Sequence, residues 1–164
     1  MLTPTVGALV LPRDVRYDVG VAVLEEPVSM ATYGVLPDAG LVATLNEGQR
    51  LTAVGYGARG VDLISNPALQ PQPRPLDKRY RATVRLLNTS EAVGDQLIKT
   101  TGVSLLRGKG EASCFGDSGG PLFVPDQQTI VGVTSGASTP VCKGPAYYQR
   151  VDLPRVLKWV RSFP

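Results

Sequence analysis

The chain has 164 residues, of which 43% are hydrophobic and 19% are charged, and its 17 basic and 14 acidic residues give a net charge of +3. This composition is that of a globular protein of one domain or two small packed halves, and it excludes an intrinsically disordered chain. The dispersed basic residues argue against a nucleic-acid surface, and no apolar stretch is long enough to span a membrane.

The 18 glycines and 14 prolines divide the chain into short apolar runs, a pattern that favours short strands over long helices. Val19–Leu24 is predicted to be a buried strand that ends before Pro27, and Leu51–Gly57 is predicted to be a second strand. The proline-rich residues 60–78 are predicted to form a surface loop. Four further strands are expected, at Tyr80–Leu87, Leu97–Leu105, Pro121–Val124 and Thr129–Thr134. Their spacing predicts an antiparallel barrel or sandwich.

Near the C-terminus, apolar residues recur at the spacing of one helix face, at Leu153, Val156, Leu157 and Val160. Asp152 is placed to cap this helix, and Pro154 suits its first turn. We therefore predict an amphipathic helix that packs against the β-structure.

The sequence contains no histidine and two cysteines. Without histidine the chain lacks the commonest general base and the commonest metal ligand. Two cysteines make at most one pair and are too few for a zinc site, which needs about four ligands. The first residues also lack the charged and apolar regions of a signal peptide.

The segment from Cys114 to Pro121 carries the strongest chemical signal. Glycines at 116, 119 and 120 surround Ser118, so the backbone can form a tight turn that other residues would not allow. Such a turn can direct the N–H groups of Gly116 and Ser118 at one point, which is the geometry that stabilises a developing oxyanion. On glycine spacing alone, a glycine-rich turn that contains an incidental serine is an equal alternative.

Further motifs along the chain strengthen this signal. Gly116–Pro121 resembles the nucleophile motif of the trypsin-like (chymotrypsin-fold) serine proteases and matches it completely, with Cys114 four residues before the serine. Ile130–Ser135 resembles the strand that lines the substrate cleft, and Cys142 with Pro145–Val151 resembles the pocket wall that leads into the C-terminal helix. The resemblance implies an all-β fold, a chymotrypsin-like antiparallel β-barrel with a C-terminal α-helix.

The resemblance covers almost all of this chain but only the later part of the family's domain. It implies that residues 51–164 form a complete C-terminal barrel with the nucleophile, the specificity pocket and the helix. Residues 1–50 are expected to be the remnant of the N-terminal barrel, which carries the catalytic aspartate.

In the family's mechanism a serine attacks the peptide bond, a histidine transfers the proton, and a buried aspartate orients the histidine. Tyr17–Leu24 resembles the strand that begins at this aspartate, so the resemblance assigns Ser118 and Asp18 to catalysis. It assigns the backbone N–H groups of Gly116 and Ser118 to the oxyanion hole. The same motif includes three supporting residues, Asp117, Gly119 and Gly120.

Asp117 resembles the carboxylate that receives the new N-terminal ammonium in activated members of the family. No mature N-terminus is recognisable before Asp18, so we expect Asp117 to lack its partner and to reorganise.

The resemblance also indicates a specificity pocket. Ala112, six residues before the serine, would form its base, and small residues would line its walls, namely Ser113, Ser135, Gly136, Ala137 and Ala146. A pocket without a buried anion would prefer an uncharged P1 side chain. Cys114 and Cys142 would form a disulfide between the serine loop and the pocket wall, with two free thiols as the alternative. Such a disulfide indicates an oxidising, extracellular location.

The sequence departs from the family pattern at the general base, because no histidine precedes Asp18. Loss of the histidine in a mechanistically similar protease lowers turnover by on the order of a millionfold. We therefore expect a serine endopeptidase domain in the form of an N-terminally truncated fragment, inactive alone, without metal or cofactor.

Two alternatives stay open, a pseudo-protease that binds peptides without cutting them and a structural β-domain without a functional cleft. The expected partners are polypeptide substrates or protein inhibitors. We expect no nucleic acid, no membrane insertion and a monomeric chain.

Overall fold

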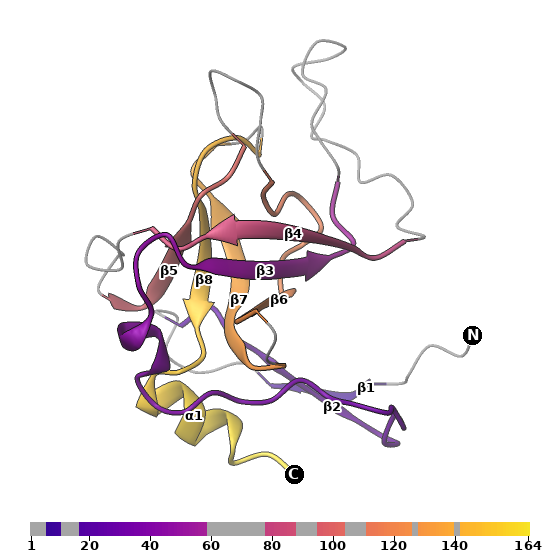
Figure 1. Cartoon of the computed structure of the whole chain (residues 1–164). Coiled ribbons are helices and arrows are strands. Elements are labelled where there is room, and N and C mark those ends of the chain that lie inside the picture. The colour runs from indigo at the N-terminus through magenta and orange to yellow at the C-terminus, as the bar shows by residue number, and fades with distance from the viewer. Residues whose placement is uncertain are drawn as a thin grey trace.

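The computed structural model describes residues 6–10, 17–58, 78–87, 95–103, 111–125, 128–139 and 142–164. Over these ranges the chain forms mostly β-structure with one α-helix (Figure 1). The predicted loop at 60–78 lies almost entirely outside the described residues. Within these ranges, no helix has the length and apolar character needed to cross a membrane.

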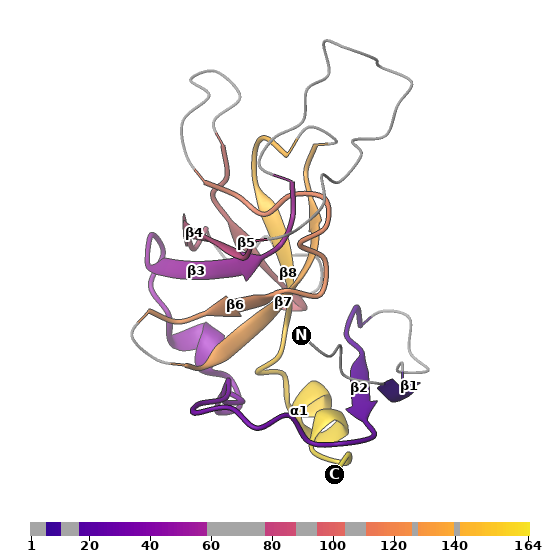
Figure 2. The ribbon, with the colours of Figure 1, turned by 90° about the vertical axis from the view of Figure 1, so that its right-hand side faces the viewer.

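Six antiparallel strands form the main sheet, in the order β4-β3-β6-β7-β8-β5. They are β3 (Arg50–Gly55), β4 (Tyr80–Arg85), β5 (Leu97–Thr100), β6 (Pro121–Phe123), β7 (Ile130–Ala137) and β8 (Ala146–Arg150). The sheet curls until its two edge strands approach each other (Figures 1 and 2). Beyond the end of β4, Leu86 forms an antiparallel bridge with Thr100, and the Leu87 N–H donates to the Lys99 carbonyl at 2.9 Å. The predicted antiparallel barrel with a C-terminal helix is confirmed.

The hydrophobic core lies inside this curled sheet. Alternation along the strands fills it, because Leu51 and Ala53 of β3 are buried while Arg50 is exposed. Gly132 of β7 gives room to the fully buried ring of Tyr148, since a Cβ at Gly132 would lie only 3.0 Å from the Tyr148 Cβ. The main core cluster comprises Val42, Leu51, Ala53, Val84, Leu86, Ile98, Leu122, Val124, Val131, Ala146 and Tyr148. Residues on both sides of the predicted boundary at position 50 therefore contribute to one core.

Two further strands, β1 (Val6–Val10) and β2 (Val21–Leu24), pair with each other in a separate antiparallel sheet. The prediction of a buried strand at Val19–Leu24 is right for the burial of Val19 but wrong for the strand itself, because Ala22 is exposed and the other residues of β2 are half-buried. The reason is that β2 pairs with β1 alone in the described part of the chain and contributes nothing to the core cluster of the main sheet.

The C-terminal helix α1 (Pro154–Val160) buries Val156 and Leu157, as the apolar spacing predicted. The predicted cap is wrong, because Leu153 is the N-cap residue and makes no side-chain cap bond. The carboxylate of Asp152 instead accepts two hydrogen bonds from the guanidinium of Arg150, at 2.9 and 2.8 Å. A buried ion pair is stable only when its polar atoms all have hydrogen-bond partners. The Asp152 carboxylate therefore pairs with Arg150 and does not cap the helix.

Asp152 also attaches the short 3-10 helix η1 (Leu41–Thr44) to the barrel. Its carboxylate accepts the Val42 N–H at 2.8 Å, and the Asp152 carbonyl accepts the Gly40 N–H at 3.0 Å. Asp152 is completely buried, and Val42 beside it belongs to the core of the main sheet.

Candidate active site

Ser118 lies on an exposed turn that leads directly into β6. Gly116 and Gly119 adopt φ values of 91° and 81°, in the left-handed region that side chains other than glycine rarely adopt. The turn is held by the Asp117 N–H, which donates to the Cys114 carbonyl at 3.0 Å, and by the Gly119 N–H, which donates to the Thr134 carbonyl of β7 at 3.0 Å. The glycines that the sequence places here are therefore required by the backbone.

The N–H groups of this turn fall into two sets. Those of Asp117, Gly119 and Gly120 donate to backbone carbonyls of the protein. Those of Gly116 and Ser118 have no protein acceptor among the residues that the structure describes. Two free N–H groups in one tight turn can donate together to an oxygen atom of a bound molecule.

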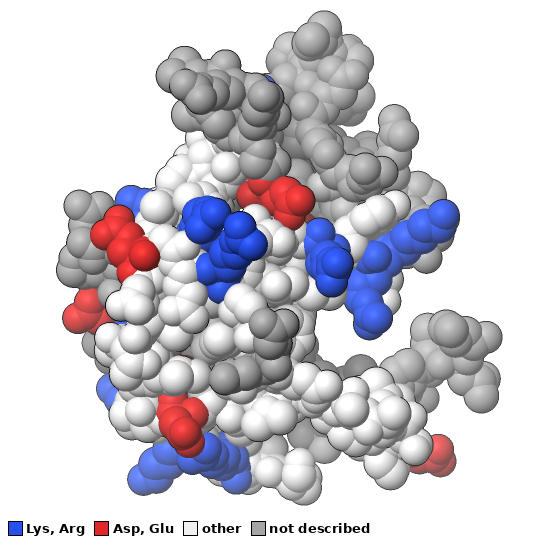
Figure 3. Space-filling model, viewed as in Figure 1, with Lys and Arg blue, Asp and Glu red and all other residues white. Residues whose placement is uncertain are grey.

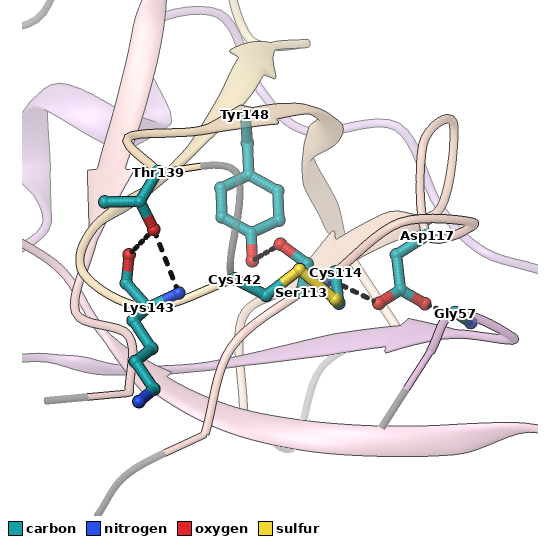
Figure 4. The surroundings of a disulfide bond; sticks show 8 residues. All are labelled: Gly57, Ser113, Cys114, Asp117, Thr139, Cys142, Lys143 and Tyr148. Carbon is teal, nitrogen blue, oxygen red and sulfur yellow. Dashed lines mark hydrogen bonds between the residues drawn. A yellow bond between two sulfur atoms is a disulfide. The ribbon is translucent and has the colours of Figure 1, made fainter. Parts of the chain in front are cut away.

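The carboxylate of Asp117 points toward Gly57, which lies just beyond the end of β3 (Figure 4). One oxygen accepts the Gly57 N–H at 2.7 Å, and the other accepts the Cys114 N–H at 2.8 Å. A Cβ at Gly55 or Gly57 would collide with this carboxylate, so glycine is required at both positions. Asp117 was expected to lack a partner, and in the structure two backbone donors hold it in place.

The disulfide between Cys114 and Cys142 ties the serine loop to the segment that follows β7, with the two Cα atoms 5.2 Å apart. The segment around Cys142 is held by a second clamp, in which the Lys143 N–H donates to the Thr139 hydroxyl at 3.2 Å (Figure 4). The cysteine pair that the resemblance implied is thus present, and the alternative of two free thiols is not.

A cavity of about 240 Å³ opens beside Ser118, and we call it the small cavity. Four of the predicted pocket residues line it, namely Ser113, Ser135, Gly136 and Ala137. The other two do not, because Ala146 is fully buried in the core and Ala112 lines a neighbouring cavity of about 260 Å³. The remaining lining residues are Cys114, Phe115, Thr134, Thr139 and Cys142.

Tyr148 of β8 supports the wall of the small cavity from inside the core. Its phenolic oxygen lies 3.1 Å from the hydroxyl oxygen of Ser113, and both residues are buried (Figure 4). Burial raises the pKa of Tyr148, an effect that hydrogen bonds from Ser113 and Thr100 partly oppose. The phenol therefore stays neutral and holds the Ser113 hydroxyl in one orientation.

Asp18 comes to the same site from the N-terminal part of the chain. Its carboxylate accepts a hydrogen bond of 2.6 Å from the hydroxyl of Ser135, which lines the small cavity together with Ser118. Its backbone N–H donates to the side-chain carbonyl of Gln149 at 3.1 Å. Residues more than a hundred positions apart in the sequence thus converge beside the serine loop.

A larger hollow of about 1060 Å³ opens at Ser118 as well, and its lining includes Tyr33, Tyr56 and Tyr80. These three side chains are 54%, 46% and 43% exposed. Because Ser118 lines both openings, an extended molecule can pass across the serine from the small cavity into the larger hollow.

Sequence reasoning did not single out Tyr148 as part of this site, and it did not predict the contacts of Ser135 or of the pair Gly55 and Gly57. Tyr148 gave no signal, because an aromatic residue in a strand more often belongs to the core. Ser135 was expected only as a pocket wall, and its bond to Asp18 depends on a long-range contact. The pair Gly55 and Gly57 did give a signal, since two glycines at the end of a strand indicate a close approach of another group.

An antiparallel barrel that presents a glycine-flanked serine beside a cavity, with a carboxylate nearby, defines the chymotrypsin-like class of folds. The family model described as Trypsin matches residues 7–160, and the chain belongs to this family.

Two proteins of Drosophila melanogaster, serine protease 1 and serine protease 2, are each 44% identical to the chain over 55 residues. Each of these matches covers 32% of this chain and 20% of the relative.

Solved structures agree with the fold. Human heparin binding protein has a TM-score of 0.73 at 19% identity, over 98% of this chain and 66% of that one. The HL collagenase has a TM-score of 0.71 at 16% identity, over 96% of this chain and 67% of that one. A scabies mite inactivated protease paralogue has a TM-score of 0.64 at 17% identity, over 96% and 66% of the two chains. The chain thus spans about two thirds of the length of these neighbours, and identities this low show the fold alone.

Proposed function

We propose that the chain is the serine-bearing part of a serine endopeptidase, in which Ser118 attacks the peptide carbonyl and forms an acyl-enzyme. The main support for the proposal is the hydrogen bond from the Ser135 hydroxyl to the Asp18 carboxylate. Ser135 and Ser118 line the same cavity, so this bond keeps the carboxylate near Ser118. Membership of the trypsin family supports the same reaction.

Each part of the site has a role in this proposal. The free N–H groups of Gly116 and Ser118 would donate hydrogen bonds to the carbonyl oxygen as negative charge develops on it, from positions fixed before the substrate binds. The disulfide at Cys114 and the anchored carboxylate of Asp117 would keep those N–H groups in place. Asp18 would orient a catalytic imidazole and stabilise its charged form.

The general base is the part that the 164 residues do not contain, because none of them is a histidine. Ser118 alone is an ordinary hydroxyl at neutral pH, and loss of the histidine lowers turnover by on the order of a millionfold in a mechanistically similar protease. We propose that the base comes from polypeptide outside these 164 residues and that the chain by itself does not hydrolyse peptides measurably.

The small cavity would bind the substrate residue before the cut bond. None of its described lining residues carries an ionisable side chain, and most are small. An uncharged P1 side chain is therefore preferred, because a buried Lys or Arg side chain would find no anion there. The disulfide supports an extracellular, oxidising location. We also propose that the chain is a monomer.

The test is the reactivity of Ser118 toward a fluorophosphonate probe, followed by mass spectrometry of the modified peptide. We expect very slow labelling of the chain and none of Ser118→Ala. Added imidazole should accelerate the labelling, because it supplies the missing base to an otherwise formed site. Asp18→Asn should reduce that acceleration and leave the uncatalysed labelling unchanged. Labelling at the rate of a complete trypsin-family enzyme without imidazole would contradict the missing-base proposal.

A second candidate function is a pseudo-protease that binds polypeptides without cutting them. The lack of histidine supports it, as does the likeness to a structure named as an inactivated protease paralogue. Two results together would favour it over the peptidase. Imidazole would not promote labelling of Ser118, and peptides with uncharged residues would bind to the chain and be recovered intact.

A further inference from the structure

Basic residues from two segments of the sequence gather over β3 and β4 in the folded chain. Lys and Arg atoms follow β4 across the face of the molecule in Figure 3, which has the same view as Figure 1. Four of these basic residues lie within residues 78–85 of the sequence, where Lys78 and Arg79 are adjacent, and the strand pairing adds a fifth from β3. We call this set of exposed residues the arginine face; it consists of Arg50, Lys78, Arg79, Arg81 and Arg85.

Strand geometry puts the central residues of this set on one side of the sheet. Side chains two positions apart share a face, so Arg81 and Arg85 point the same way from β4 and lie about 13 Å apart at 3.3 Å per residue. Arg85 is paired directly with Arg50 of β3 in the strand register. Like charges directly opposite each other destabilise a sheet. The Arg50–Arg85 pair therefore repels, and a bound anion would relieve this repulsion.

Few acidic side chains offset the positive charge of the arginine face. In the described ranges none of its five cations forms an ion pair, although the Arg85 guanidinium donates to the Gly48 carbonyl at 3.1 Å. One carboxylate lies at the edge, where Glu111 accepts the Thr83 N–H of β4. Asp117 lines a cavity together with Arg79 and Arg81, but its carboxylate is taken by two backbone N–H groups. The exposed face of these two strands therefore carries an excess of positive charge.

The backbone beneath the arginine face offers few bonds to a docking polypeptide. β3 is paired on both sides, with β4 and with β6. At the other edge of β4, the Thr83 N–H is taken by Glu111 and the Arg85 N–H by the Thr101 hydroxyl. A peptide therefore gains little from strand addition here, and binding must depend on side-chain charge.

We propose that the arginine face binds a linear sulfated polysaccharide. Closely spaced sulfates along a stiff chain can contact Arg50, Arg81 and Arg85 in turn, and the planar guanidinium pairs with oxyanions through two parallel hydrogen bonds. The disulfide supports an oxidising compartment outside the cytosol, where sulfated polysaccharides are the common linear polyanions. The site needs neither Ser118 nor a catalytic base, so it does not depend on the proposed peptidase activity.

The experiment measures the affinity of the whole chain for heparin as the probe, by calorimetry at about 0.15 M salt, where the Debye length is about 8 Å. We expect Arg81→Gln with Arg85→Gln to weaken binding at least tenfold. Arg81→Lys with Arg85→Lys should lose less, because the charge remains but the bidentate geometry does not. Glu111→Gln should tighten binding, because it removes a carboxylate that lies beside β4.

The matched control removes two exposed charges elsewhere, through Lys158→Gln with Arg161→Gln in and after α1. We expect this variant to keep at least half of the affinity. An equal loss in the control would show a general effect of net charge and overturn the proposal. Absence of binding would overturn it too, as would equal or tighter binding of poly-glutamate or single-stranded DNA of matched charge.

Discussion

The hydroxyl oxygen of Ser113 lies 3.1 Å from the phenolic oxygen of Tyr148, behind the wall of the small cavity. Tyr148→Phe keeps the ring and removes the partner of a buried hydroxyl, so we expect a loss of about 1 kcal/mol in the free energy of unfolding. Urea denaturation measures this loss. Tyr147→Phe, one residue earlier on a half-buried side chain, is the matched control and should change stability by less than half as much.

The same pair predicts how stability changes at alkaline pH. Burial raises the pKa of Tyr148 above the value of 10.0 that an exposed tyrosine has. Between those two pKa values the folded chain keeps a proton that the unfolded chain has lost, so its stability must fall as pH rises. The contribution is complete below about pH 10 and is lost above it.

Denaturation of the wild type and of Tyr148→Phe over this pH range gives the test. The variant should have a shallower alkaline decline, because it has no proton to lose at this position. Identical slopes in the two proteins would show that Tyr148 titrates as an exposed residue does.

Gly57→Ala tests the anchoring of the serine loop. The new Cβ would collide with the Asp117 carboxylate, which has backbone bonds on both sides and little room to move. We expect a loss of about 2 kcal/mol, in the range of overpacked sites, measured by thermal unfolding. Gly136→Ala is the control, since nothing lies within 4 Å of a Cβ there. If both variants melt at the wild-type temperature, the carboxylate is not held as described.

Asp152→Ala tests the buried ion pair. It leaves the Arg150 guanidinium without its partner and the Val42 N–H without an acceptor, and we expect a loss of about 3–5 kcal/mol. In chemical denaturation, a lower midpoint with an unchanged m-value would show that the variant loses stability without a change in the surface exposed on unfolding. Asp38→Ala, at an exposed carboxylate, should have little effect. A similar small effect at Asp152 would contradict the structure.

The sequence was sufficient where local chemistry decides the structure. The glycines around Ser118, the alternation of apolar residues in β3 and the spacing in α1 each predicted an element that is present. The resemblance added the class of barrel, because the order of several motifs along a chain is far more specific than any one of them.

Long-range contacts explain what the sequence did not predict. Asp152 looked like a helix cap, because nothing local shows that Arg150 and Val42 meet it inside the protein. Ala146 looked like a pocket residue, but it lies two positions before Tyr148 on β8 and shares the core face of that strand. The arginine face was hidden for the same reason, since Arg50 and Arg85 become neighbours only through the strand register.

The order of strands in the main sheet also has a kinetic consequence. β3 lies between β4 and β6, yet β6 follows β3 in the chain only after β4, β5 and the whole serine loop. The β6–β7 pair can form locally, whereas the β3–β6 pair must close a loop that contains much of the chain. Folding rates fall as such distant pairings come to dominate. We therefore expect refolding to take milliseconds to seconds, with the docking of β3 on β6 as the slow event.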